Sequence, residues 1–307
     1  MKLVRYEGAH GAELGVLSDS VDDESVGVIP LRQLVPDFAG NAVEDLLVDG
    51  LLDRVDGLSL NETHEEHSVL LEALLAPIAR PGKILCAAMN YQAHVEEVGA
   101  APFDKDRIVP KLFLKPPTTL LRPYGQLELP TTSSAVDWEI ELAAVIGTNA
   151  RDLSVDEALD CVAGYSVIND ISARKMDWGL PERADSHWDN FFDWLMGKWP
   201  DGFAPLGPCF VSSSEIPDPQ DLQLTLEVNN EVRQASSTSR MIFTVAELIS
   251  FASRFMTLEP GDIIATGTPE GVGAATQNYL KDGDVMVGRI EGIGSIRTTV
   301  HTRVQSQ

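Results

Sequence analysis

Hydrophobic and polar residues alternate most regularly over residues 136–147, VDWEIELAAVIG. Apolar residues recur at every second position, which predicts a β-strand: Val136, Trp138, Ile140 and Leu142. The opposite face then carries Asp137, Glu139 and Glu141, and beyond Leu142 the segment is wholly apolar, so we expect the strand to enter the interior. Carboxylates near a buried zone repel one another and lose hydration. They indicate either a solvated strand face or a divalent-cation site, and an all-carboxylate set favours Mg²⁺, Mn²⁺ or Ca²⁺ over zinc.

The first 80 residues have the pattern of a small α/β module. Short alternating stretches predict strands at residues 2–6, 13–17 and 25–30, and helical spacing predicts helices at residues 41–55 and 65–76. Two prolines and a glycine within residues 77–82 indicate a boundary. We therefore divide the chain into an amino-terminal module, residues 1–80, and a main domain, residues 81–307.

The main domain has more strand patterns than helix patterns. Buried strands are predicted at residues 83–88 and 262–265. Two alternating stretches, residues 222–228 and 231–235, flank Asn229-Asn230, which is suited to a two-residue hairpin turn. Residues 244–256 begin with a capping box and keep a helical apolar stripe. The fold class predicted is α+β, rich in β-sheet.

The composition is that of a globular protein with a large core, because 44% of the 307 residues are hydrophobic and 23% are charged. No apolar run reaches the roughly 18–20 residues of a membrane span, so no membrane partner is expected. The net charge of −24, from 47 acids and 23 bases, argues against nucleic-acid binding, which needs clustered positive charge. Three widely spaced cysteines form neither a metal nor a disulfide pattern, so we expect a cytoplasmic protein.

Three further segments carry candidate functional side chains. His94 and Glu97 stand three residues apart on a predicted helix, where a carboxylate makes an imidazole more basic, although an exposed surface pair is the simpler explanation of the spacing alone. Asp170 ends a predicted strand as a helix cap or as a third metal carboxylate. Residues 175–199 hold four of the five tryptophans and indicate a substrate-facing flap, a subunit contact or ordinary core.

Six segments in register make the chain resemble the fumarylacetoacetate hydrolase family. They are NYQAHVEE with His94 and Glu97, LFLKPP with Lys115, DWEIEL with Glu139 and Glu141, GYSVINDISAR with Asp170 and Arg174, GK with Lys198 before APLGP, and TGTPEGVG with Thr268. The resemblance covers about residues 80–300 and favours the catalytic interpretation of each segment. It implies a mixed β-sheet roll or sandwich for the catalytic domain.

The resemblance also implies a role for each side chain. Glu139, Glu141 and Asp170 are expected to bind Mg²⁺ or Mn²⁺, with Ca²⁺ as a third candidate. Lys198 is expected to face a developing oxyanion, and the pair His94 and Glu97 to activate water from a lid. Substrate contacts are expected from Lys115, Arg174, Asp177 and Thr268. Asp177 stands where relatives often carry a substrate-contacting glutamine, so the substrate is less defined than the metal site.

The reaction expected from the resemblance is hydrolytic cleavage of a C–C bond in an acylpyruvate, such as fumarylpyruvate, through a metal-stabilised enolate. Related reactions on the same site stay open: isomerisation or decarboxylation of an unsaturated 2-oxo-dioate, oxaloacetate decarboxylation, and dehydration of a 2-keto-3-deoxy sugar acid. A non-catalytic binding protein is the remote alternative. The expected partners are a small anionic 2-oxo acid and, as is common in the family, a second copy in a homodimer.

Overall fold

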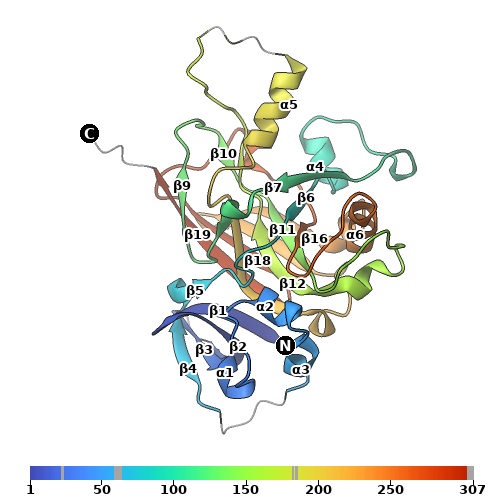
Figure 1. Ribbon diagram of the computed structural model, residues 1–307. Helices are drawn as coiled ribbons and strands as arrows, with labels where there is room; N and C mark the ends of the chain where they lie inside the picture. Colours follow the sequence, from blue (N-terminus) through green and yellow to red (C-terminus); the bar gives the residue numbers. More distant parts are fainter. Residues whose placement is uncertain (22–23, 59–63, 182, 184–185, 303–307) are drawn as a thin grey trace.

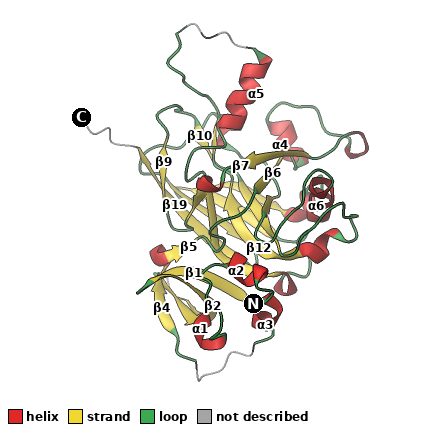
Figure 2. Ribbon diagram, viewed as in Figure 1, coloured by secondary structure: helices red, strands yellow, loops and turns green. Residues whose placement is uncertain are grey.

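The computed structural model describes residues 1–21, 24–58, 64–181, 183 and 186–302. Strands form the centre of the molecule and helices lie mostly around them (Figure 2). The largest sheet has twelve strands. In spatial order these are β4 (His67–Leu70), β3 (Ser25–Pro30), β2 (Gly11–Val21), β1 (Lys2–Gly8), β14 (Ala204–Ser212), β12 (Val162–Asn169), β11 (Ile140–Ile146), β17 (Ile263–Ala265), β6 (Ile84–Ala88) and β7 (Lys111–Lys115), with β5 (Leu74–Leu75) beside β1 and β8 (Leu120–Leu121) beside β14.

A second sheet of five strands shares a hydrophobic core with the first. Its order is β16 (Glu231–Ser237), β15 (Gln223–Val228), β18 (Val285–Ile290), β19 (Gly294–Thr302) and β9 (Gln126–Leu129), and a small ribbon pairs β10 (Val136–Asp137) with β13 (Ser172–Ala173). The helices are α1 (Leu31–Leu34), α2 (Val43–Val48), α3 (Leu52–Asp56), α4 (Gln92–Glu97), α5 (His187–Met196), α6 (Val245–Ser253) and α7 (Gly273–Thr276). No helix among the described residues has the length and apolar character to cross a membrane.

Strand β11 lies between two hydrophobic cores, as its apolar sequence predicts. Ile140 and Leu142 belong to the core shared with β15, whereas Ala143 and Val145 belong to the core on the opposite face of the sheet. Because successive side chains of a strand point to opposite faces, Glu141 lies on the same face as Ala143. The predicted strand over residues 136–147 is interrupted at Trp138 and Glu139, which separate β10 from β11.

The prediction of an α+β, β-rich fold is confirmed, and the three strands expected near the amino terminus are β1, β2 and β3. These strands (blue in Figure 1) extend the large sheet, because β1 pairs with β14, where Lys2 lies opposite Val211 and Leu3 opposite Phe210. The same sheet therefore crosses residue 80, and the division of the chain there stays a prediction.

The two helix predictions in this region need correction. The helix expected over residues 41–55 is divided into α2 and α3, and Gly50 adopts a left-handed conformation between them, with φ of 66°. The helix expected over residues 65–76 is wrong, because this segment supplies β4 and β5. Its backbone pairs with the edges of β3 and β1, a long-range demand that overrides local helical spacing.

The hairpin predicted around Asn229-Asn230 is confirmed, since β15 pairs with β16 and both asparagines have positive φ, 53° and 65°. This is the conformation of a type I′ turn, which asparagine and glycine tolerate and β-branched residues do not. We expect Asn230→Val to lower the free energy of unfolding by about 1–2 kcal/mol and Asn230→Gly to leave it nearly unchanged. Urea unfolding of both variants measures this, and equal stabilities would contradict the turn assignment.

Candidate active site and metal centre

Three buried carboxylates come together where β11 and β12 pair. Glu139 lies just before β11, Glu141 lies within it, and Asp170 follows β12 directly. The antiparallel register places Ile140 opposite Asn169, so Glu139 and Asp170 are neighbours across the pair. The Asp170 amide donates to Glu139 O at 2.8 Å, and the Glu139 amide donates to Asn169 Oδ1 at 2.9 Å. One carboxylate oxygen from each acid lies within 4.8 Å of the other two.

Three cations pair with these acids. Lys198 Nζ lies 2.8 Å from Glu139 Oε2 and 2.6 Å from Asp170 Oδ2. Lys115 Nζ, fully buried, lies 2.6 Å from Asp170 Oδ1 and donates to Ile171 O at 3.0 Å. Charged hydrogen bonds of this kind are shorter and stronger than those between neutral groups.

Arg174 connects the cluster to a fourth carboxylate. Its guanidinium bonds Glu139 Oε1 and lies 2.7 Å from Asp137 Oδ1. Asp137 Oδ2 also accepts from the Ala274 amide at 2.7 Å, so this acid is already satisfied and stands outside the carboxylate cluster. Together with Asp137, the cluster has four acids against the three cations Lys115, Lys198 and Arg174.

The acids therefore differ in how well their charge is compensated. Burial raises the pKa of Glu139, but Lys198 and then Arg174 outweigh it, so the pKa lies below its ordinary value. Burial, reinforced by Asp170 and Glu139, raises the pKa of Glu141 well above its ordinary value. Glu141 accepts from the Gly267 amide through Oε2 at 2.7 Å, whereas its buried Oε1 has no hydrogen-bond partner among the described residues.

These observations fit a divalent metal ion. The donor set is made of oxygen only, one oxygen of each acid lies close to the others, and a buried carboxylate oxygen has no partner within the part of the chain that the structure describes. Such an oxygen is costly unless an ion or a polar group meets it. Glu139, Glu141 and Asp170 could therefore hold Mg²⁺, Mn²⁺ or Ca²⁺.

The predicted pair on α4 is formed. His94 Nδ1 lies 2.7 Å from Glu97 Oε1, and His94 is buried. The second carboxylate oxygen of Glu97 accepts from the Gly271 amide at 2.8 Å, so the loop after β17 fixes the acid. The carboxylate thus orients the imidazole and leaves Nε2 as the free nitrogen.

A small cavity of about 40 Å³ is lined by one member of the pair, His94, and by one member of the cluster, Glu139. His94, Glu139, Arg174, Lys198 and Thr268 all line it, together with the apolar Ala87, Ala88, Met89, Phe113 and Trp194. A base, two cations and a hydroxyl therefore face the same space. This arrangement can hold a small anion and move a proton on it.

Two predicted substrate residues lie away from that cavity lining. Lys115 is buried, and its ammonium donates hydrogen bonds to the Asp170 carboxylate and to Ile171 O. Asp177 is exposed, and its carboxylate accepts from the Gly179 amide at 2.8 Å in a local turn. Substrate contacts for both stay predictions.

Sequence reasoning missed two residues that hold the site. Asn90 donates to Thr266 O at 2.8 Å and to Phe243 O at 2.9 Å, which fixes the start of α4. Asn90 belongs to the motif NYQAHVEE, so its buried position could have been predicted from the sequence. Gln234, in β16, bonds both Ile140 and Thr268, and nothing in its local sequence distinguishes it from an exposed hairpin residue.

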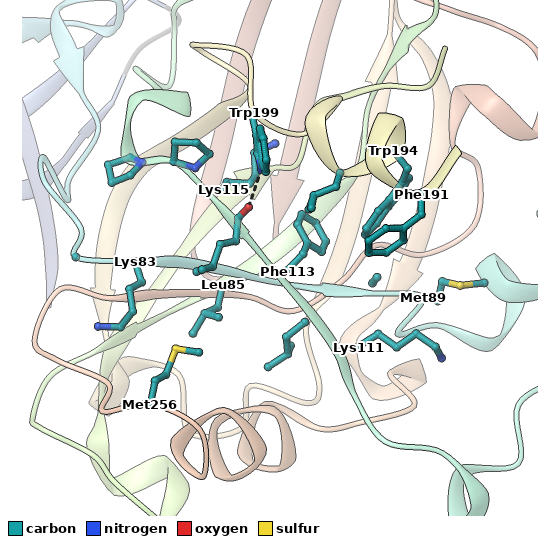
Figure 3. A pocket seen from close by; sticks show the side chains of 17 residues that line it. Lys83, Leu85, Met89, Lys111, Phe113, Lys115, Phe191, Trp194, Trp199 and Met256 are labelled. Carbon is teal, nitrogen blue, oxygen red and sulfur yellow. Dashed lines mark hydrogen bonds between the residues drawn. The ribbon is translucent and has the colours of Figure 1, made fainter. Parts of the chain in front are cut away.

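A larger apolar groove of about 980 Å³ lies beside the site (Figure 3). Phe191 and Trp194 from α5, Phe113 and Leu114 from β7, and Trp199 form much of its lining. The Trp199 indole donates to Leu114 O at 3.2 Å. Phe113 and Trp194 line both the groove and the small cavity, so they form the wall between them. The aromatic segment 175–199, predicted as a flap, a subunit contact or ordinary core, thus lines both the groove and the small cavity.

The chain is similar to known proteins in both sequence and fold. The family model described as "Fumarylacetoacetate (FAA) hydrolase C-terminal" matches residues 83–301. The mitochondrial oxaloacetate tautomerase of Bos taurus is 37% identical over 96% of this chain and 90% of its own length. A fumarylacetoacetate hydrolase structure from Exiguobacterium antarcticum has a TM-score of 0.78 and 32% identity over 99% of this chain and 100% of that one. A 2-hydroxyhepta-2,4-diene-1,7-dioate isomerase structure from Mycobacterium marinum has a TM-score of 0.71 and 30% identity over the same shares, 99% and 100%.

The carboxylate cluster predicts a measurable loss of metal binding in Glu141→Gln. Glutamine keeps the acceptor for the Gly267 amide and removes the charge, so Mn²⁺ affinity measured by calorimetry should fall about tenfold or more, since even outer contacts of a metal site are worth about 10–100-fold. The matched control is Glu157→Gln, an exposed acid bonded to Ser154, which should keep the affinity. Equal affinities of the two variants would exclude Glu141 as a ligand.

Proposed function

The chain belongs to the fumarylacetoacetate hydrolase family, and we propose that it is a divalent-metal-dependent enzyme that forms the enolate of a small 2-oxo acid. The observation that carries the proposal is the cavity of about 40 Å³ lined by His94, Lys198, Arg174 and Glu139. A proton acceptor and two positive charges there face the same reacting atoms. Each is the kind of group that enolate formation needs.

We propose Mg²⁺ or Mn²⁺ as the cofactor, held by Glu139, Glu141 and Asp170. When bound, such an ion withdraws electron density from a carbonyl oxygen. Its positive charge also compensates the one acid by which the cluster and Asp137 together exceed the three cations. The binding of a 2-oxo acid, itself an anion, is then compatible with a chain whose net charge is −24.

His94 is the proposed base. It takes a proton from the carbon next to the keto group, that C–H electron pair becomes the new C=C bond, and the carbonyl π electrons move to oxygen. The oxygen then takes a proton from water, and the hydroxide that is left takes the proton held by His94, which gives the enol and restores the base. Lys198 and Arg174 offset the charge that develops on the oxygens, and Glu97 keeps the imidazole in the orientation that exposes Nε2.

Oxaloacetate is the first substrate that we propose, with keto–enol tautomerisation as the reaction. The reaction needs neither an attacking water nor a leaving group. A relative named for this activity aligns along nearly the whole chain. Decarboxylation of oxaloacetate is the nearest variation: its C3–C4 bond would break to release CO2, and the electrons of that bond would form the enolate of pyruvate, which needs the same stabilisation of charge on oxygen.

C–C hydrolysis of an acylpyruvate is the second candidate, favoured by the intact His94–Glu97 pair. The pair would take a proton from water, whose oxygen adds to the distal carbonyl. The C–C bond then breaks, its electrons form the pyruvate enolate, and that enolate takes a proton. The products are pyruvate and a carboxylic acid, so the two candidates differ in what they release.

We also propose a homodimer that forms across the apolar groove. Strand β7 is the last strand of the large sheet in the described part of the chain, and exposed edges favour pairing with another chain. Leu114 there is 47% exposed and Trp199 40%. The residues that line the groove include lysines and no acid, so two copies of a very acidic chain can meet there without charge repulsion. A two-fold contact uses the same patch on both copies.

The cysteines indicate that the protein works in a reducing compartment. Cys86, Cys161 and Cys209 are buried and free, and none forms a disulfide within the described residues. That pattern is usual where thiols stay reduced. The cytoplasm is the compartment that we propose.

His94→Ala should lower kcat for oxaloacetate tautomerisation about 10²–10⁴-fold, because a positioned base contributes that much. The matched control is His301→Ala, an exposed histidine in β19, which should leave kcat unchanged. The assay follows deuterium exchange at C3 and enol absorbance, with and without EDTA, and includes acetylpyruvate and fumarylpyruvate. Release of pyruvate only from the diketo acids would select hydrolysis, and EDTA-insensitive turnover would exclude the metal.

Leu114→Asp should convert the proposed dimer to a monomer, since it places a charge in the centre of an apolar contact. Sedimentation velocity measures the assembly state. Val232→Asp, at another exposed apolar position (61%) on β16, is the control and should stay dimeric. An unchanged dimer in Leu114→Asp would move the interface elsewhere.

A further inference from the structure

The buried side chain of Gln234 joins the two sheets at the active site. Gln234 is 1% exposed, although it lies in a strand whose neighbours Arg233 and Ala235 are partly or fully open to solvent. Its Oε1 accepts from the Ile140 amide at 3.0 Å. Its Nε2 donates to Thr268 Oγ1 and to Pro269 O, both at 2.9 Å. The partners fix the orientation of the amide, because a backbone N–H only donates and a carbonyl only accepts.

These contacts close a ring around the residue between two metal-binding candidates. Ile140 separates Glu139 from Glu141, and its amide lies at the interruption between β10 and β11. The Thr268 hydroxyl donates to Ile140 O at 3.0 Å, while Gln234 holds both Ile140 N and Thr268. Each polar atom of the ring is buried, so removing one member leaves the others unsatisfied.

The same loop continues to the catalytic pair. Gly271 donates to Glu97 Oε2 at 2.8 Å, and its carbonyl accepts from the Trp138 indole at 3.0 Å. Gly271 has φ of 101°, and a Cβ built there would lie 1.9 Å from Arg233 O. The loop is therefore packed directly on β16 beside Gln234, and its position sets that of Glu97 and His94.

We propose that Gln234 is a positioning residue that fixes the spacing between the carboxylate cluster and the His94–Glu97 pair. It acts through Ile140 on one side and through residues 268–271 on the other, and it has no place in the cavity lining. This role rests on the proposed function. The spacing matters there because a proton must pass between the base and the substrate. Groups of this kind around an active site change activity about 10–100-fold.

The test compares Gln234→Leu with Gln220→Leu. Gln220 accepts from the Val245 amide at 2.7 Å and donates to Thr238 O at 3.0 Å, so it is a glutamine with similar backbone bonds away from the site. We expect Gln234→Leu to lower kcat about 10–100-fold with KM changed less than about threefold. Gln220→Leu should keep both constants. Hydrogen–deuterium exchange of the peptide 266–273 should become about tenfold faster only in the Gln234 variant.

Gln234→Glu provides the second variant. A buried neutral carboxyl group keeps the acceptor for Ile140 and one donor for the loop, so its kcat should lie between those of the parent protein and Gln234→Leu. The role is overturned if hydrogen–deuterium exchange of residues 266–273 in both Gln234 variants matches that in Gln220→Leu. It is also overturned if kcat of Gln234→Leu stays within about twofold of that of the parent protein. If the parent turns over no 2-oxo acid, the proposed function fails, and the exchange data still decide whether Gln234 holds the loop.

Discussion

The structure depends on the burial of carboxylates against cations in the middle of the large sheet. Glu139, Glu141 and Asp170 are each less than a tenth exposed, and Lys198 bridges two of them. Removing one member of such a set leaves an uncompensated buried charge, which is strongly destabilising. The strands around the cluster must therefore keep their register, because a shift of one residue would turn every side chain to the opposite face.

The interruption between β10 and β11 is what makes room for this chemistry. A continuous strand would keep its backbone groups in the ladder, whereas here side chains of Asn169, Gln234 and Thr268 satisfy the backbone of Glu139 and Ile140. Side-chain partners of this kind are specific to one conformation, and they connect the cluster to the loop that carries Gly271. The carboxylate cluster and the His94–Glu97 pair are thus positioned by one hydrogen-bond network.

Local pattern was sufficient for the features that local sequence determines. Alternation placed β11, the pair of asparagines placed the hairpin, and the spacing of His94 and Glu97 predicted a contact that the structure forms. Long-range demands were out of reach. Residues 65–76 look helical but complete the edges of β3 and β1, and Asp137, which alternation places on one strand face with Glu139 and Glu141, pairs with Arg174. Gln234 meets its partners from another sheet, a relation that no spacing along the chain records.

The wall formed by Phe113 and Trp194 separates the small cavity from the apolar groove. Lys198 Nζ lies 5.1 Å from the Phe113 ring centre and 5.9 Å from that of Trp194, so the wall stands directly against a charged group of the site. Trp194 comes from α5, which projects outward from the molecule, whereas the acids lie where β11 and β12 pair (Figure 1). Substitutions in α5 can reshape the space offered to a substrate while the acids stay fixed.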